Sequence, residues 1–140
     1  MKRVTRQQQT RSTITRERLV QATLAEIFEV GYHAATTQDI ARRAGVSRGA
    51  LLHHFPMRAD ILLSAMDALL DDGTRQIKSV ATDLRDGNVA LPDFVEFLWS
   101  LFSGRFFYLS LEMITEARHD AGLRERMIPV VKRFHTALDE

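Results

Sequence analysis

TTQDIARRAGVSRGALLHHF, residues 36–55, predicts two short helices joined by a turn at Gly45 and followed at once by a proline. A tight turn of this kind sets the second helix across the first, which is how a helix-turn-helix offers side chains to the DNA major groove. Thr36 and Ser47 are residues that favour helix N-termini, and glycine suits a turn with positive φ. The stretch therefore predicts a DNA-binding unit.

The chain before this stretch predicts one more helix. Thr15 is a good N-cap, Gly31 is a typical stop, and apolar residues recur between them at helical spacing at Val20, Leu24, Ile27 and Phe28. Residues 1–12 are polar and basic without a hydrophobic period, so we expect a flexible arm there. Residues 13–57 are then a three-helix DNA-binding domain.

The rear of the chain, residues 58–140, is also expected to be helical. Apolar residues keep a helical period over 58–85, which corresponds to a helix of roughly 40 Å that Gly73 is expected to bend or weaken. Helical patterns return over 91–118, with an expected break near Gly104, and from residue 123 onward. The predicted fold class is all-α: a helix-turn-helix domain joined by a long helix to a second helical domain, for which the family resemblance given below implies ligand binding and dimerisation.

The last residues, Asp139-Glu140, stand inside a helical pattern without a cap or a glycine stop. Acidic residues suit a helix C-terminus poorly. This ending favours a regulatory domain that is incomplete at its C-terminus, and a frayed natural terminus is the alternative.

The net charge of +1 conceals a basic front and an acidic rear. Residues 1–58 carry ten Lys/Arg against four acids, which is +6, and residues 59–140 carry nine against fourteen, which is −5. A basic front suits a polyanionic partner, although compositional drift over a short chain is the simpler alternative.

Several function classes find no support in the sequence. The chain has no cysteine, no apolar signal segment and no run long enough to span a membrane, so we expect an intracellular protein without disulfides and without a membrane partner. Glu116-x-x-His119 has the spacing of a di-iron ligand pair, but such sites need a second copy. No phosphate loop or nucleophile elbow occurs. We therefore expect no metal, no cofactor and no enzymatic activity.

The front half resembles the TetR family of bacterial transcriptional regulators. The resemblance rests on Phe28, Gly31-Tyr32, Thr36-Thr37, Asp39-Ile40-Ala41, Ala44-Gly45-Val46-Ser47, Gly49, Leu51 and His54-Phe55. Two positions depart from the family pattern: Leu52 replaces a usual tyrosine, and Arg58 replaces a usual lysine. The resemblance implies a dimeric regulator of the bacterial cytoplasm and nucleoid that binds a palindromic double-stranded operator and releases it when a small molecule binds.

Helix geometry assigns the expected DNA contacts. Arg48 and Leu52 share one face of the second helix of the motif, Gly49 and His53 share the neighbouring face, and Leu51 and Phe55 form the opposite side, which is expected to be buried. Arg48 is the candidate for a bidentate guanine contact. Thr37, His53 and Arg58 are expected to contact phosphate and to set the register. Of Arg42 and Arg43, one is expected near phosphate, and the arm arginines either reach DNA or are solvated. The full set of expected DNA-binding residues is Thr37, Arg43, Ser47, Arg48, Gly49, Leu52, His53 and Arg58.

Aromatic residues gather in the rear half, where five of the eight phenylalanines lie between Phe94 and Phe107. They fit either a cavity for an apolar or amphipathic inducer or ordinary core packing. The candidate ligand residues are Phe97, Leu98, Phe102, Phe106, Tyr108 and Glu112. The predicted function is a ligand-released repressor. The alternatives are a constitutive DNA-binding protein whose rear half only dimerises and a helical interaction module with a vestigial motif.

Overall fold

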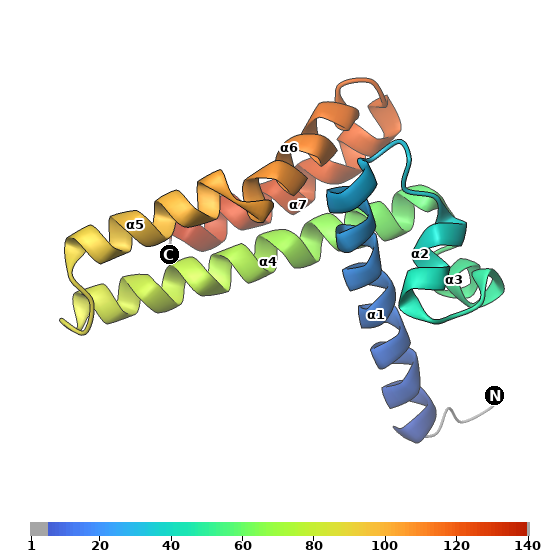
Figure 1. The fold of residues 1–140 in the computed structure, drawn as a ribbon, viewed down its shortest axis with the longest axis horizontal. Coiled ribbons are helices and arrows are strands. Elements are labelled where there is room, and N and C mark those ends of the chain that lie inside the picture. The colour runs from blue at the N-terminus through green and yellow to red at the C-terminus, as the bar shows by residue number, and fades with distance from the viewer. Residues whose placement is uncertain (1–5, 140) are drawn as a thin grey trace. The chain divides into compact units, whose positions relative to one another are not determined.

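The computed structural model describes residues 6–139, and the expected all-α fold is confirmed: these residues form helices and connecting turns with no strand. They divide into two compact units, residues 6–65 and 66–139, and each unit is described by itself. The helices are α1 (Arg6–Val30), α2 (Thr37–Ala44), α3 (Arg48–His54), α4 (Arg58–Arg85), α5 (Leu91–Ser103), α6 (Arg105–Ala117) and α7 (Ala121–Asp139) (Figure 1).

The first unit packs α1, α2, α3 and the first two turns of α4 around one apolar core. α2 packs against α1, and α3 packs against α2. The core consists of side chains with almost no exposed surface: Leu19, Ile27, Ile40, Leu51, Phe55 and Ile61. The Arg16 guanidinium lies 4.4 Å from the centroid of the Phe55 ring and donates a 3.0 Å hydrogen bond to Ser64 Oγ, so α1 is joined to α3 and to the start of α4.

The start of α1 differs from expectation. The helix begins at Arg6, so residues 6–12 are helical rather than part of a flexible arm, while residues 1–5 lie outside the described chain. No glycine or proline interrupts this segment, and Arg and Gln are good helix formers. Thr15 is not a cap, because its hydroxyl donates to the Arg11 carbonyl inside the helix. Phe28 is also 47% exposed, outside the buried stripe in which it was expected.

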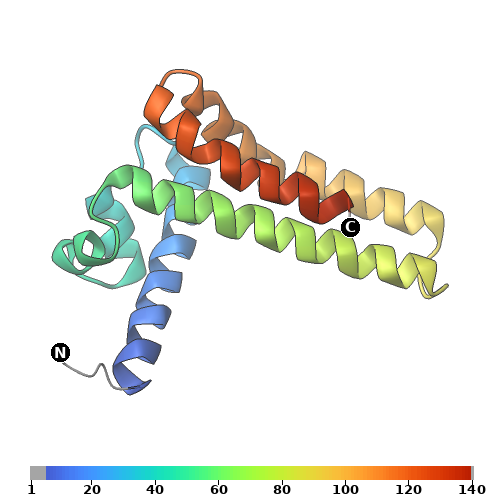
Figure 2. The same cartoon turned by 180° about the vertical axis from the view of Figure 1, so that it is seen from behind.

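The second unit consists of the later turns of α4 with α5, α6 and α7. In both views α5 and α7 run beside these turns (Figures 1 and 2). α6 packs against α5 and α7, and it carries the buried residues Phe106, Leu109 and Met113. The expected break at Gly104 is present, since α5 ends at Ser103 and α6 begins at Arg105.

The long helix α4 runs without interruption through Gly73. A Cβ atom added at Gly73 would lie 2.5 Å from Cε2 of Phe106, so this glycine makes room for an aromatic ring instead of bending the helix. The division between the units falls after Ala65, inside α4, rather than at residue 57. The reason is that Ile61, Leu62 and Ala65 are buried in the core, so the start of α4 is part of the first unit.

Candidate nucleic-acid interface

Side-chain caps and one glycine fix the geometry of the α2–turn–α3 motif. Thr36 Oγ1 accepts a 3.1 Å hydrogen bond from the Asp39 amide at the start of α2. Gly45 ends α2 in the left-handed region, with φ of 69°, and its amide donates to the Arg42 carbonyl at 3.1 Å. Ser47 Oγ then accepts a 3.0 Å hydrogen bond from the Ala50 amide and starts α3. The orientation of α3 is thus set by local hydrogen bonds.

α3 has a buried face and an exposed face. Leu51, with no exposed surface, anchors it to the core, and Phe55 follows directly as its buried C-cap. The expected DNA-binding residues of α3 and its cap are all exposed: Ser47, Arg48, Gly49, Leu52 and His53. The expected division of the helix between core and surface is therefore observed.

Arg48 is an exposed cation of α3 that has no interaction partner within the first unit. Within residues 6–139 its side chain takes part in no ion pair and no hydrogen bond. Gly49 is equally unconstrained, because a Cβ atom there would meet only Ser47 Oγ, at 3.9 Å. The protein's own packing therefore does not require a glycine at this position.

Two other expected contact residues have partners inside the first unit. Arg43 Nε donates to the buried Glu26 carboxylate at 2.6 Å, and Arg43 also pairs with Glu29, so it joins α2 to α1. The hydrogen bonds to Glu29 and Glu26 raise the pKa of Arg43 above its usual value, and the one to Glu29 contributes more. Two acids one turn apart on α1 were the sequence signal for this pairing, and it was missed.

Arg58 is also directed inward. Its guanidinium donates to the backbone carbonyls of Tyr32 and Ala35 and lies 4.6 Å from the centroid of the Tyr32 ring. The arginine therefore holds the loop between α1 and α2. No sequence pattern points to this role, because the acceptors are backbone atoms 23 and 26 residues away.

The six expected ligand residues differ in exposure. Phe106 is buried against Phe102 and Phe134, with ring centroids 5.9 and 6.2 Å apart, whereas Phe102 and Tyr108 are 45% and 41% exposed. Phe97, Leu98 and Glu112 are half-buried. A pocket of about 400 Å³ between α6 and α7 is lined by other residues, and the role of the six candidates stays a prediction.

Membrane spans and metal sites are absent from the described residues. No helix in residues 6–139 is long and apolar enough to cross a membrane. The same part of the chain contains no cluster of three or more His, Asp or Glu side chains that could hold a metal ion.

Comparison with known proteins gives the family. Residues 19–65 match the model for bacterial regulatory proteins of the tetR family. Over 139 aligned residues the chain is 32% identical to an uncharacterized HTH-type transcriptional regulator of Mycobacterium bovis, covering 96% of this chain and 69% of the relative. The chain belongs to the TetR family. It is also 30% identical over 135 residues to the HTH-type transcriptional regulator CymR of Pseudomonas putida, covering 96% of this chain and 66% of CymR.

Solved structures of TetR-type proteins share the fold. A TetR-family transcriptional regulator of Mesorhizobium loti superposes with a TM-score of 0.74 at 20% identity, covering 92% of this chain and 70% of that one. The multidrug binding protein EbrR, solved with imidazole, gives 0.64 at 19% identity, covering 88% and 70%. The chain thus spans about two thirds of the length of its TetR-family relatives. Its sequence relatives are transcriptional regulators and not enzymes, as the sequence predicted.

Proposed function

We propose that this TetR-family chain is a transcriptional repressor that binds a palindromic operator through α3 and is released by a small molecule bound in the second unit. The observation that carries the DNA-binding half is the exposed face of α3, where Arg48 has no intramolecular partner and Gly49 leaves the backbone accessible. Two copies present two such helices, which suits a homodimer on two half-sites. A repressor of this kind acts on the nucleoid in the bacterial cytoplasm.

The expected contact residues divide into base-reading and positioning groups. Arg48 reads a guanine edge, and Leu52, 38% exposed, meets a thymine methyl where a tyrosine is usual in the family. Thr37, Ser47 and His53 set the register through phosphate contacts. Arg43 and Arg58 support binding mainly by holding α2 and the α1–α2 loop in place, since their guanidinium groups already have partners.

The regulatory half of the proposal is supported by analogy and by the second unit. EbrR is described as a multidrug binding protein and was solved with a small molecule. The second unit of this chain has a pocket of about 400 Å³, within the size range of small-molecule sites, and an aromatic group that includes Phe102 and Phe106. A ligand there would release DNA by favouring a state in which the two recognition helices no longer match the half-sites.

The experiment compares Arg48→Ala with Arg75→Ala, an exposed arginine of the second unit paired only with Asp72 one turn away. Binding is titrated by gel shift against a duplex that the protein enriches from a random pool and against a scrambled duplex. Loss of a bidentate guanine contact is worth about 1–3 kcal/mol, or about 5- to 150-fold in operator affinity. We expect this loss only for Arg48→Ala and mainly on the operator.

Equal losses on both duplexes would show that Arg48 contacts phosphate, and no loss would remove α3 as the reading helix. The melting temperature of Arg48→Ala should match that of the parent protein, because the side chain has no intramolecular partner to lose. A protein that binds the operator but whose affinity no small molecule lowers would favour a constitutive DNA-binding protein over a ligand-released repressor.

A further inference from the structure

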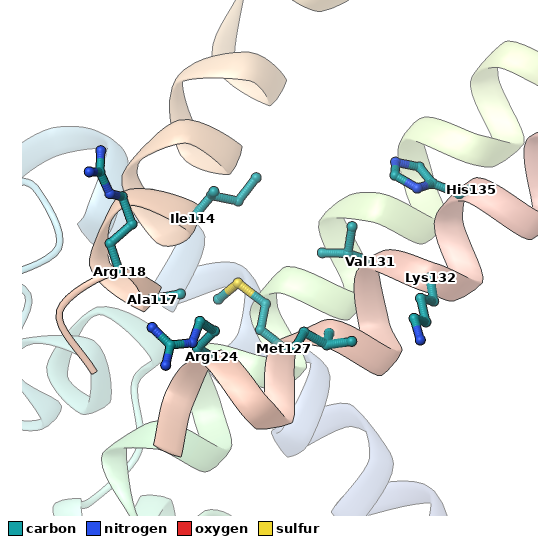
Figure 3. A pocket seen from close by; sticks show the side chains of 9 residues that line it. Ile114, Ala117, Arg118, Arg124, Met127, Val131, Lys132 and His135 are labelled. Carbon is teal, nitrogen blue, oxygen red and sulfur yellow. The ribbon is translucent and has the colours of Figure 1, made fainter. Parts of the chain in front are cut away.

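The pocket between α6 and α7 has an apolar floor. On α6 the floor consists of Ile114 and Ala117, and on α7 of Met127, Ile128 and Val131. Figure 3 shows Met127 extending toward the last turn of α6, so that both helices contribute to one surface. The volume of about 400 Å³ is at the lower end of the range for small-molecule sites.

The rim of this pocket is basic. Its polar lining residues are Arg118 at the end of α6 and Arg124, Lys132 and His135 on α7, and no acid is among the nine residues that line it. The second unit, residues 66–140, carries thirteen acids against nine Lys/Arg. The rim, with three Lys/Arg and no acid, is therefore positively charged in a unit that has more acids than bases.

The rim cations are also unengaged within the protein. Elsewhere on this unit basic side chains pair with acids: Arg75 with Asp72, Arg85 with Asp86, and Arg133 with Asp67. Across residues 6–139, by contrast, the side chains of Arg118, Arg124 and Lys132 take part in no ion pair or hydrogen bond. Three unneutralised cations beside an apolar surface are complementary to an anion with an apolar body.

The rim and floor are arranged in order along α7. Arg124, Met127, Ile128, Val131 and His135 recur at helical spacing on one side of the helix. Arg118 and Arg124 lie at one end of the pocket and His135 at the other (Figure 3). The separation of 11 positions from Arg124 to His135 corresponds to roughly 16 Å along the helix axis. The pocket is thus an elongated apolar groove with two arginines at one end.

We propose that this groove binds an amphipathic organic monocarboxylate. The carboxylate lies between Arg118 and Arg124, whose guanidinium groups offer paired N–H donors to carboxylate oxygens. The apolar body lies along Met127, Ile128 and Val131 toward His135. The inference deepens the proposed function by naming the chemical class of its small-molecule signal, and it rests on that function only for the claim that binding releases DNA.

The test uses three probes with the same apolar chain and different head groups: decanoate, decanol and decylammonium. Each is titrated calorimetrically into the full chain well below its micelle concentration. We expect decanoate to bind at least tenfold more tightly than decanol, and decylammonium to bind most weakly. Equal affinities for the three probes, or no binding of decanoate, would overturn the proposal.

Variants then locate the site. The double variant Arg118→Gln/Arg124→Gln should bind decanoate about tenfold more weakly, because each exposed ion pair contributes about threefold to the affinity. Its affinity for decanol should not change. Arg85→Gln, in the same unit but outside the pocket, should change neither affinity. Ile128 belongs to the floor of the pocket and is 46% exposed, so Ile128→Asp puts a negative charge there and should also lower the affinity for decanoate. Unchanged decanoate affinity in both the double variant and Ile128→Asp would refute this location.

The DNA assay separates this inference from the proposed function. Decanoate that binds the groove and leaves operator affinity unchanged supports the monocarboxylate site and contradicts the ligand-release mechanism. Normal operator binding together with equal affinities for the three probes contradicts the monocarboxylate site and supports the DNA-binding function. Melting curves should show that the double variant stays folded, since the structure gives these two arginine side chains no folding partners to lose.

Discussion

Replacing Arg58 with alanine distinguishes a DNA contact from a structural role. The TetR-family pattern places a cation here and predicts a phosphate contact, whereas the structure directs the guanidinium to the carbonyls of Tyr32 and Ala35 and onto the Tyr32 ring. Hydrogen bonds from a charged donor contribute about 1.5–3 kcal/mol each, and a cation–π contact about 0.5–2 kcal/mol. Because Arg58 is half-buried and the three contacts share one group, we expect Arg58→Ala to lower the free energy of unfolding by about 2–4 kcal/mol.

The assay is thermal unfolding followed by circular dichroism, combined with the operator titration. For a chain of this size a loss of 2–4 kcal/mol corresponds to a fall in melting temperature of about 6–12 °C. Arg58→Lys keeps the charge and N–H donors but not the planar guanidinium over the Tyr32 ring, so it should lose about half as much. Arg42→Ala is the control, because Arg42 is 76% exposed and pairs only with Asp39 one turn away. An unchanged melting temperature with weaker binding to every duplex would refute the structural role.

Two further predictions concern packing and pH. Gly73→Ala should gain about 1 kcal/mol of helix propensity but lose about 1–3 kcal/mol because its methyl group overlaps the Phe106 ring. Urea unfolding should therefore show a lower free energy of unfolding, and adding Phe106→Leu to the same chain should restore part of it. A single variant that is more stable than the parent would mean that the ring moves aside freely. Burial, with the charges of His53 and Arg16, lowers the pKa of His54 below its usual 6.5. The unfolded chain therefore takes up this proton first, so stability is complete above about pH 6.5 and falls as the pH drops through the lower, folded-state pKa. His54→Gln should flatten that dependence between pH 7.5 and 5.5, and an identical slope in both proteins would exclude His54 as its source.

The sequence predicted local features of this fold better than features that depend on distant partners. The Gly45 turn, the Ser47 cap and the buried Leu51 follow from residue chemistry within one or two turns, and all three are present. The predicted start of α1 at Thr15 was wrong. A threonine can either cap a helix or donate to a carbonyl within one, and the position of Thr15 in the sequence does not decide between these two roles.

The candidate site was predictable to the same extent. The exposed face of α3 follows from helical spacing around Leu51, so the exposure of Arg48 and Leu52 was predictable, and their contact with DNA stays a prediction. The inward orientation of Arg43 and Arg58 depends on Glu26 and on backbone carbonyls of another segment, which one-dimensional spacing does not show. The α6–α7 groove was not predicted, because aromatic density directed the expected ligand residues to α5 and the first two turns of α6, whereas the apolar floor of the groove consists of aliphatic residues and Met127.

The inward arginines change what the basic front of the chain means for binding to a polyanion. Affinity for DNA depends on salt because cations on the protein displace condensed counterions from phosphates. A guanidinium held by carboxylates or carbonyls, as in Arg43 and Arg58, displaces few of them. The charge of +6 counted along residues 1–58 therefore overstates the number of counterions that each protomer releases, and the salt dependence of operator binding should follow the unengaged cations alone.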